Sequence, residues 1–271
     1  MSEFECIQVE VVNKVAYASL NRPDKANALD HKLWFEIGDL ANWVSTTPEI
    51  RALVLQGAGK HFTAGIDFSL IMQIVGETAS LQDGHKQEAL RTKIIALQAS
   101  FTALENCSKP VIASIQGSCI GGGIDLITAC DIRYASEQAV FSVKEIDLAI
   151  VADIGTLQRL PPIVGEGVAR ELAMTGRKFS AQEAQDMGLV SKVFADHDSL
   201  NAGVREIAEQ IASKSPLTQR GIKHVMNHCR GRTVADGLNY VATWNAAMLM
   251  STDAQEAMAA MMQKRQAEFK D

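Results

Sequence analysis

Three acidic side chains in mostly apolar stretches are the residues best suited to proton transfer. Glu145 and Asp153 lie eight positions apart in "KEIDLAIVADIGTLQRL", with Asp147 between them, and Asp125 lies twenty positions before Glu145. A buried carboxylate is costly unless it is paired, hydrogen-bonded or protonated. These acids therefore either lie on the surface, where they would titrate as ordinary carboxylates, or serve as general acids and bases.

Two glycine-containing turns could form an anion site close to these acids. "HFTAGID" (61–67) follows the expected strand "RALVLQGA", and "GGGID" (121–125) follows the expected strand "VIASIQGS". Glycine allows sharp turning and close approach of the backbone to a ligand. If a helix begins after each turn, free N–H groups point to the mouth of the sheet. Two converging N–H donors would form an oxyanion hole, whereas either turn alone would be an ordinary strand-to-helix connection.

The elements expected around these residues alternate between strands and helices. Strands are expected over 7–20 (two runs that turn at Asn13-Lys14), 51–58, 109–118, 131–136 and 139–143, and helices over 30–44 and 85–107. Asp30 is the expected N-cap of the first helix. This alternation predicts an α/β core with parallel strand pairing.

Beyond residue 198 the pattern becomes helical, so a core over 1–197 and a helical C-terminal region over 198–271 are expected. Helices are expected over 199–216, 217–229, 234–250 and 252–270. The last two are rich in Met and Ala. Their apolar faces either pack on the chain's own core or form a subunit interface, for which adaptable Met-rich surfaces are common.

Composition limits the classes of partner and compartment. A net charge of −6 gives no general attraction to nucleic acid or to an anionic membrane. The five irregularly spaced cysteines match neither a zinc pattern nor a disulfide framework, which indicates a reducing compartment. The sequence shows no spanning apolar run, no signal or transit peptide and no peroxisomal "SKL" ending, so the expected location is the cytoplasm.

Two other motifs are incomplete. "GAGKH" (57–61) lacks the glycine at position 54 and the Ser or Thr at position 61 that a phosphate-binding loop needs. "HVMNH" (224–228) spaces two histidines by one helical turn but lacks the glutamate of a zinc protease and an evident third ligand. No metal site is therefore predicted.

Four stretches together resemble one family. "NRPDKANAL", "HFTAGID", "GGGIDLITACDIRYAS" and "GTLQRLPPIVG" are similar, in order and spacing, to the crotonase (enoyl-CoA hydratase/isomerase) superfamily over nearly the whole chain. The resemblance implies a spiral of ββα repeats with a helical C-terminal region, and trimers that often pair into hexamers. It also implies acyl-CoA thioester substrates, whose enolate would be held by the N–H groups of Ile66 and Gly122.

The resemblance further implies how the CoA portion is held. Arg22, Ala26 and Ala64 would lie near the CoA nucleotide. Lys264, in "MMQKRQAEFKD", resembles the C-terminal lysine of the family that reaches the CoA phosphates bound by a neighbouring subunit. No cofactor is implied beyond the CoA of the substrate, and the acyl chain length is expected to depend on loops such as 67–90.

The three acids point to one subgroup. In hydratases of this family the positions of Asp125 and Glu145 are both glutamate and together hold one water, and the position of Asp153 is normally glycine. The Asp–Glu–Asp set, with its intervals of 20 and 8, is similar to that of Δ3,5-Δ2,4-dienoyl-CoA isomerases. The flanking "DLITACDIRY" and "ADIGTLQRLP" resemble the same subgroup, and Asp147 is interpreted as structural.

This chemistry suits two fixed carboxyl groups. Bringing a 3,5-diene into conjugation with the thioester removes a proton at C2 and returns one at C6, four bonds away. We expect Glu145 to act as the base at C2, Asp153 to act as a protonated acid at C6, and Asp125 to orient or bias Glu145. The pKa of Asp153 would be raised by like charge on Glu145 and by apolar neighbours, namely Ile150, Val151 and Ile154.

Two other functions stay open. A hydratase or a simpler Δ3-Δ2 isomerase would have the same fold, although Asp125 and the acid at 153 count against a hydratase, and a residual hydratase activity would be compatible with these residues. A non-catalytic, RNA-binding relative would differ in class. The net negative charge, and the lack of a basic stripe interleaved with aromatic residues, count against it.

Overall fold

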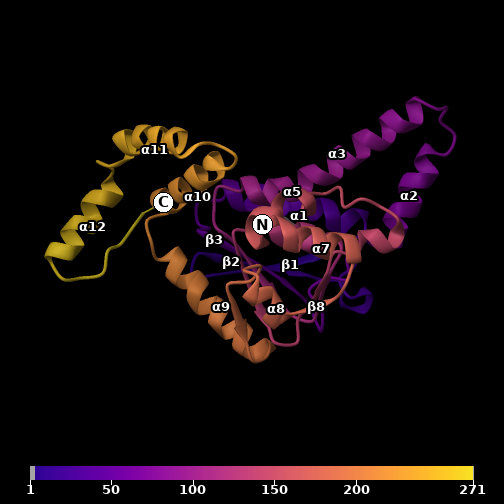
Figure 1. The fold of residues 1–271 in the computed structure, drawn as a ribbon. Coiled ribbons are helices and arrows are strands. Elements are labelled where there is room, and N and C mark those ends of the chain that lie inside the picture. The colour runs from indigo at the N-terminus through magenta and orange to yellow at the C-terminus, as the bar shows by residue number, and fades with distance from the viewer. Residues whose placement is uncertain (1–3, 271) are drawn as a thin grey trace.

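The computed structural model describes residues 4–270, so residues 1–3 and Asp271, which the two predicted regions include, lie outside the described residues. A six-stranded sheet in the order β1-β2-β3-β4-β6-β9 forms the centre (Figure 1). Its strands are Ile7–Val12 (β1), Val15–Leu20 (β2), Ala52–Gly57 (β3), Val111–Ile115 (β4), Ile132–Ser136 (β6) and Lys192–Phe194 (β9). Within this six-stranded sheet only β1 runs antiparallel to its neighbour, and the other strands are parallel. The predicted α/β core with parallel strand pairing is therefore confirmed.

A smaller sheet lies beside the first and creates the repeat. It has the order β5-β7-β8, with strands Ser118–Ile120 (β5), Val140–Ser142 (β7) and Phe179–Ser180 (β8). A parallel bridge between Thr63 and Cys119 extends it by one position. Three times, therefore, the chain passes from the large sheet to the small one and then into a helix, which is the predicted spiral of ββα repeats.

The helices that end these three passes begin close to the residues of interest. They are α2 (Phe68–Thr78), α4 (Gly122–Thr128) and the 3-10 helix η2 (Glu145–Leu148). The segment 67–90, expected to be a loop, therefore contains a helix, since α2 fills much of it. Together with α3 (His85–Asn106) this helix forms the projection at the upper right of Figure 1.

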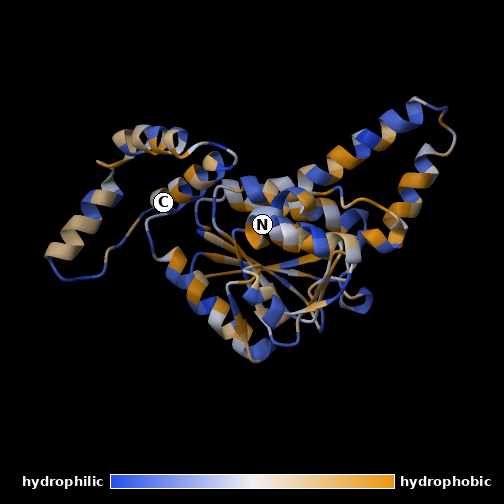
Figure 2. Ribbon diagram, in the orientation of Figure 1, coloured by the Kyte–Doolittle hydropathy of each residue, from blue (hydrophilic) through white to orange (hydrophobic). Residues whose placement is uncertain are grey.

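Helices enclose both faces of the large sheet. Alternate residues of β2 face opposite sides: Ala16 and Ala18 pack in the cluster that contains α1 (His31–Thr46) and α3, whereas Val15 and Tyr17 pack with α9 (His197–Ala212). Figure 2 shows the sheet as largely hydrophobic where these helices cover it. The predicted N-cap is confirmed, because the Asp30 carboxylate accepts the Leu33 N–H at 2.9 Å.

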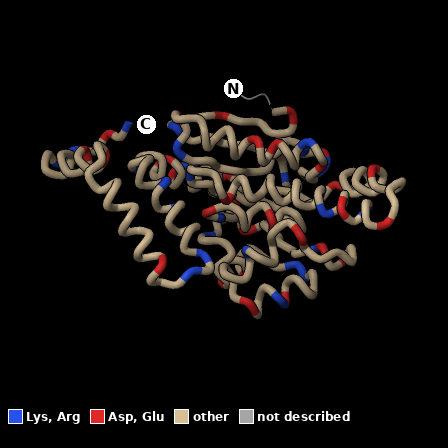
Figure 3. The backbone as a smooth tube through the Cα atoms, turned by 90° about the horizontal axis from the view of Figure 1, so that it is seen from above, with Lys and Arg blue, Asp and Glu red and all other residues tan. Residues whose placement is uncertain are grey.

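The remaining helices complete the body. They are η1 (Pro23–Lys25), α5 (Thr156–Arg159), α6 (Pro161–Val164), α7 (Glu166–Thr175) and α8 (Ala181–Asp186). Acidic and basic residues are interspersed along the chain rather than gathered in one basic stripe (Figure 3). Within residues 4–270, none of the helices combines the length and the apolar character needed to cross a membrane.

Three helices follow α9. They are α10 (Pro216–Cys229), α11 (Val234–Met248) and α12 (Thr252–Met262), and α11 and α12 form the arm at the left of Figure 1. The helix expected over 252–270 is wrong beyond Met262, because Lys264 takes a left-handed φ of 53° and the chain turns back. Since α9 packs on the sheet and the buried Lys223 of α10 donates to the Leu104 carbonyl at 3.1 Å, the arm begins after α10. The boundary at 197/198 stays a prediction.

Candidate active site

The two glycine turns lie against each other, as the sequence predicted. The Thr63 N–H donates to the Ser118 carbonyl at 2.9 Å, and the Ile120 N–H donates to the Thr63 carbonyl at 3.2 Å. A methyl group on Gly65, which has a φ of +90°, would lie 2.6 Å from the Ile120 carbonyl oxygen and 3.5 Å from the Gly122 nitrogen. Only glycine therefore fits where the turns meet.

The N–H groups of Ile66 and Gly122 are free to bind a ligand. The Leu29 N–H donates to the Gly65 carbonyl and the Asp67 N–H donates to the Leu29 carbonyl, so the Ile66 N–H between them faces the other side. Gly122 is the first residue of α4, where an N–H has no partner inside the helix. Among residues 4–270 neither group donates a backbone hydrogen bond. This arrangement fits the implied oxyanion hole, and that role stays a prediction.

Replacing Gly65 by Ala is expected to damage both the fold and this pair of donors. The left-handed φ and the contact with Ile120 should lower the free energy of unfolding by about 2 kcal/mol. Displacement of the Ile66 N–H should lower kcat about a hundredfold. Thermal unfolding and initial rates measure the two effects. Gly76→Ala is the matched control, because a methyl group there meets no atom within 4 Å, and this variant should keep wild-type activity.

Asp125 is a buried carboxyl group. Its side chain lies on α4, only 1% of the residue is exposed, and one carboxylate oxygen accepts the Thr156 N–H at 2.7 Å. Burial raises the pKa of Asp125 to about 6, although the hydrogen bonds from Thr156 act in the opposite direction. The interpretation of these acids as solvated surface residues is therefore wrong for Asp125.

Glu145 lies at the second glycine turn. A methyl group on Gly121 would lie 3.3 Å from the Glu145 Oε1 atom, so the carboxylate adjoins this turn. The Oε2 atom is buried and has no hydrogen-bond partner within the described part of the chain. Burial first, and then the negative charge of Asp125, raise the pKa of Glu145 to about 7. Such a carboxylate is well matched to removing a proton near neutral pH.

Asp153 is the third acid with a raised pKa. Burial raises its pKa, as the sequence predicted, and Ile154 beside it is buried. Ile150 and Val151, which were expected to contribute, are 42% and 72% exposed in the single chain. Their predicted contribution is therefore not supported, because these side chains line the pocket of Glu145 and not the one that Asp153 lines.

Side chains distant in sequence hold the backbone around Asp153. Gln98, on α3, donates to the Asp153 carbonyl at 2.6 Å, and the Arg159 guanidinium donates to the Ile154 carbonyl at 3.2 Å. A methyl group on Gly155 would lie 1.8 Å from that guanidinium, so the Arg159 side chain lies directly over the glycine. Arg159 also forms an ion pair with Glu105 at 2.8 Å. Gln98 and Arg159 therefore position Asp153.

Neither of these two positioning residues was predicted from the sequence. Arg159 lies inside the "GTLQRL" stretch that carried the family resemblance, which was the one available signal. Gln98 lies in an ordinary helical pattern, 55 positions before its partner, so that nothing local marked it.

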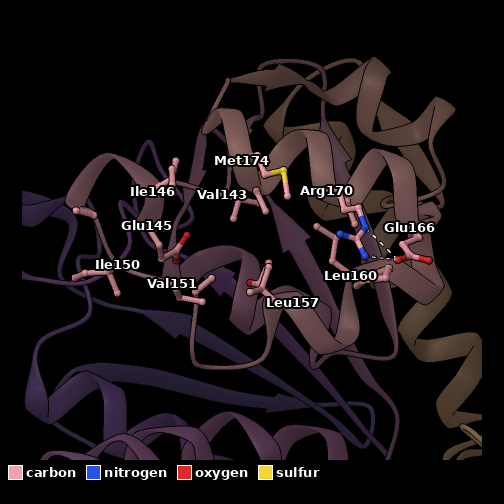
Figure 4. Close-up of a pocket in the computed structure, with 16 residues that line it drawn as sticks. Val143, Glu145, Ile146, Ile150, Val151, Leu157, Leu160, Glu166, Arg170 and Met174 are labelled. Carbon is pink, nitrogen blue, oxygen red and sulfur yellow. Dashed lines mark hydrogen bonds and ion pairs between the residues drawn. The ribbon is translucent and has the colours of Figure 1, made fainter.

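Glu145 and Asp153 open on different pockets. Glu145 lines a mostly apolar pocket of 630 Å³, and Figure 4 shows its carboxylate pointing into the space between Val143, Val151 and Leu157. A pair of charged residues, Arg170 and Glu166, lies at the other end of this pocket. Asp153 lines a second pocket of 520 Å³.

Three of the residues expected to contact CoA lie close together. The Ala64 N–H donates to the Ala26 carbonyl at 2.9 Å, and the Ala64 side chain is exposed. Arg22 forms ion pairs with Asp30 and Asp67, each at 3.1 Å, so its charge already ties two segments of the chain together. The contacts of these residues with CoA stay predictions.

Lys264 lies apart from this group. It follows α12 on the C-terminal arm, and its side chain is exposed. This position suits the role that the resemblance implies, in which the lysine serves a neighbouring subunit, and that role also stays a prediction.

Comparison with known proteins identifies the family. The family model described as enoyl-CoA hydratase/isomerase matches residues 10–271. The chain belongs to this family. Among its members, the peroxisomal Δ(3,5)-Δ(2,4)-dienoyl-CoA isomerase of Arabidopsis thaliana is 51% identical to this chain, over 98% of this chain and 96% of that protein. The mitochondrial human enzyme of the same name is 42% identical, over 97% and 81% respectively.

A solved structure from the enoyl-CoA hydratase/isomerase family supports the fold. The enoyl-CoA hydratase of Bacillus anthracis superposes with a TM-score of 0.86 at 33% identity, over 98% of this chain and 99% of that chain. The crotonase fold predicted from the sequence is therefore confirmed.

Proposed function

We propose that this protein is a Δ3,5-Δ2,4-dienoyl-CoA isomerase, which converts 3,5-dienoyl-CoA to 2,4-dienoyl-CoA. The observation that carries the proposal is a third carboxyl group of raised pKa, Asp153, which lies near enough to Glu145 for its charge to raise the pKa of Glu145. A reaction that moves a proton between distant carbons needs two such groups. Relatives 42% and 51% identical that bear this enzyme name support the same conclusion.

The proposed mechanism assigns one task to each group. Glu145 takes the C2 proton, and the thioester oxygen of the resulting dienolate accepts hydrogen bonds from the Ile66 and Gly122 N–H groups. Each such donor typically contributes about 3 kcal/mol to lowering the barrier. Asp153 then gives its proton to C6. Asp125, buried close by, raises the pKa of Glu145 through its negative charge.

The isomerase rate should depend on pH through Glu145. The base works only when charged and the acid Asp153 only when protonated, so kcat/KM should follow a bell-shaped profile. It should rise as Glu145, whose pKa is raised from 4.5 to about 7, loses its proton, and fall where Asp153 loses its own. Replacement of Asp125 by Asn removes a like charge and should shift this rise to lower pH. Initial rates measured across pH test both statements. A rise centred near pH 4.5 in the wild type would contradict the role of a buried base.

Ultraviolet absorbance tests the proposed function directly. In the product the diene is conjugated with the thioester carbonyl, so isomerisation of a medium-chain 3,5-dienoyl-CoA should produce a new long-wavelength band. Turnover of a 2-enoyl-CoA without that band would favour the hydratase of the same fold. Lack of turnover with both substrates would favour a binding protein that has lost catalysis.

We also propose that the protein needs no cofactor beyond the CoA of its substrate, and that it works as a homotrimer or as a hexamer of paired trimers. The assembly is supported by apolar side chains on and beside α11 and α12 that the single chain leaves in solvent. Val234 is 80% exposed, Met250 75% and Met262 82%. Exposed apolar surface of this kind is typical of an interface.

Replacing Met262 by Glu should weaken this assembly. A charge placed in an apolar interface is desolvated without a partner and should lower the association constant by about tenfold or more. Light scattering at several protein concentrations measures the mass. Met174→Glu is a control on the body, since Met174 is 68% exposed but lies outside the arm. Equal masses for the two variants and the wild type would argue against an interface at Met262.

The cytoplasmic location predicted from the sequence remains a proposal. The names of two relatives give other locations: the Arabidopsis protein is called peroxisomal and the human protein mitochondrial. Fractionation of the source cells tests it.

A further inference from the structure

The proposed function, on which this inference rests, leaves the two carboxyl groups in exchanged protonation states. When the C2–H bond breaks, its electron pair enters the dienolate and the proton goes to Glu145. When the C6–H bond forms, an electron pair of the dienolate takes the proton of Asp153. After one turnover Glu145 is neutral and Asp153 is charged. One proton must leave Glu145, and one must reach Asp153, before the next substrate reacts.

The pocket lined by Asp153 is separate from the place where the thioester would lie. It has a volume of 520 Å³, and its lining includes neither Glu145 nor the two glycine turns. At about 30 Å³ per molecule, this volume has room for several waters. The thioester end of a substrate bound at the turns would therefore lie outside the second pocket, and only its C6 region would need to approach Asp153.

The lining of the second pocket mixes apolar side chains with polar ones, and the polar ones extend from Asp153 to exposed residues. The ion pair of Arg159 with Glu105 forms part of its wall, together with Thr102. At the outer end the Arg230 side chain is 55% exposed, and Gln158 is also exposed. Such groups can hydrogen-bond a chain of waters along the whole path.

We propose that this second pocket is the path by which Asp153 regains a proton from solvent after each turnover. A water O–H bond breaks, its proton binds the Asp153 carboxylate, and the hydroxide left behind is neutralised by the proton that Glu145 releases to solvent once product has gone. Charge and atoms balance over the cycle, and water is the only co-reactant.

Asp125 offers the competing route. Asp125 is 1% exposed. Its charge raises the pKa of Glu145, and the charge of Asp153 raises the pKa of Asp125. A proton passed from Glu145 through Asp125 to Asp153 would stay inside the protein. The proton removed from C2 of one substrate would then appear at C6 of the next.

Isotope labelling separates the two routes. The enzyme is equilibrated in D₂O and given a large excess of ordinary 3,5-dienoyl-CoA, and the C6 position of the product is analysed by mass spectrometry. Supply from solvent places deuterium at C6 in nearly every turnover. Return through Asp125 places protium there after the first turnover, and that result overturns the proposal.

Variants that narrow the pocket test its part in the supply. Gln158→Trp and Pro162→Trp each add bulk at an exposed position of its lining, and Gln185→Trp is the matched control because Gln185 is an exposed helical glutamine that lines neither pocket. The narrowed variants should keep the rate of the first turnover, but later turnovers should slow by roughly tenfold or carry more protium at C6. If both variants match Gln185→Trp in rate and label, the pocket carries no proton and the proposal fails.

The experiments distinguish a failure of the proposed function from a failure of the proton path. A protein that never produces the long-wavelength band is not this isomerase. A protein that produces it with protium at C6, or with unaffected narrowed variants, is the isomerase without this path.

Discussion

Replacing Glu145 by Gln is expected to lower kcat for isomerisation about a thousandfold, because a general base contributes between a hundredfold and ten-thousandfold. The amide has nearly the same shape as the carboxylate, but it cannot accept the C2 proton. The variant should also lose exchange of the C2 hydrogens of a non-isomerisable acyl-CoA with D₂O. Ultraviolet rates and NMR of the C2 position measure the two losses.

A matched variant isolates the base from general effects of charge. Glu137 is exposed and lies outside both pockets, so Glu137→Gln should keep wild-type rates. Retention of C2 exchange in Glu145→Gln would show that another group removes the proton. The fold should tolerate the change, because the buried Oε2 atom of Glu145 makes no hydrogen bond within the described residues that the variant could lose.

Replacing Asp153 by Asn should abolish isomerisation to a similar extent and yet leave C2 exchange intact. Glu145 can still remove and return the C2 proton in this variant, but no acid remains to deliver a proton to C6. We therefore expect kcat for isomerisation to fall about a thousandfold, with exchange at C2 within a few-fold of the wild type. Exchange and isomerisation are measured on the same 3,5-dienoyl-CoA.

Asp147→Asn is the matched control for this variant. Asp147 lies on the segment between the two acids and forms a surface ion pair with Lys144, with about half of its side chain exposed. Surface pairs of this kind contribute little to stability, so this variant should behave as the wild type. Full isomerase activity in Asp153→Asn would rule out the acid role. Joint loss of exchange and isomerisation would indicate instead that Asp153 supports Glu145.

The contrast between the two variants matters more than either loss alone. If one mobile carboxylate performed both steps, its replacement would abolish C2 exchange and isomerisation together. Replacement of the other carboxylate would then change neither activity. The structure favours two fixed groups, because Gln98 and Arg159 hold the backbone of the Asp153 segment and Gly121 adjoins the carboxylate of Glu145.

Local patterns in the sequence determined the parts of this protein that depend on short-range physics. The hairpin at Asn13-Lys14 follows from two adjacent residues that take positive φ, and α1 begins where Asp30 caps it. The two glycine turns and the three acids could be read as a site because their residue types and order suit one chemistry. The alternation of strands and helices determined the fold class in the same way.

Only the tertiary structure decided how these parts meet. Burial of Asp125 and Glu145, which raises both pKa values, depends on packing between segments far apart in the chain. The placing of Glu145 and Asp153 on separate pockets, the support from Gln98, and the end of α12 at Met262 have the same origin. A sequence pattern records which residue lies three or four positions away, but desolvation and positioning depend on which residue lies three or four ångströms away.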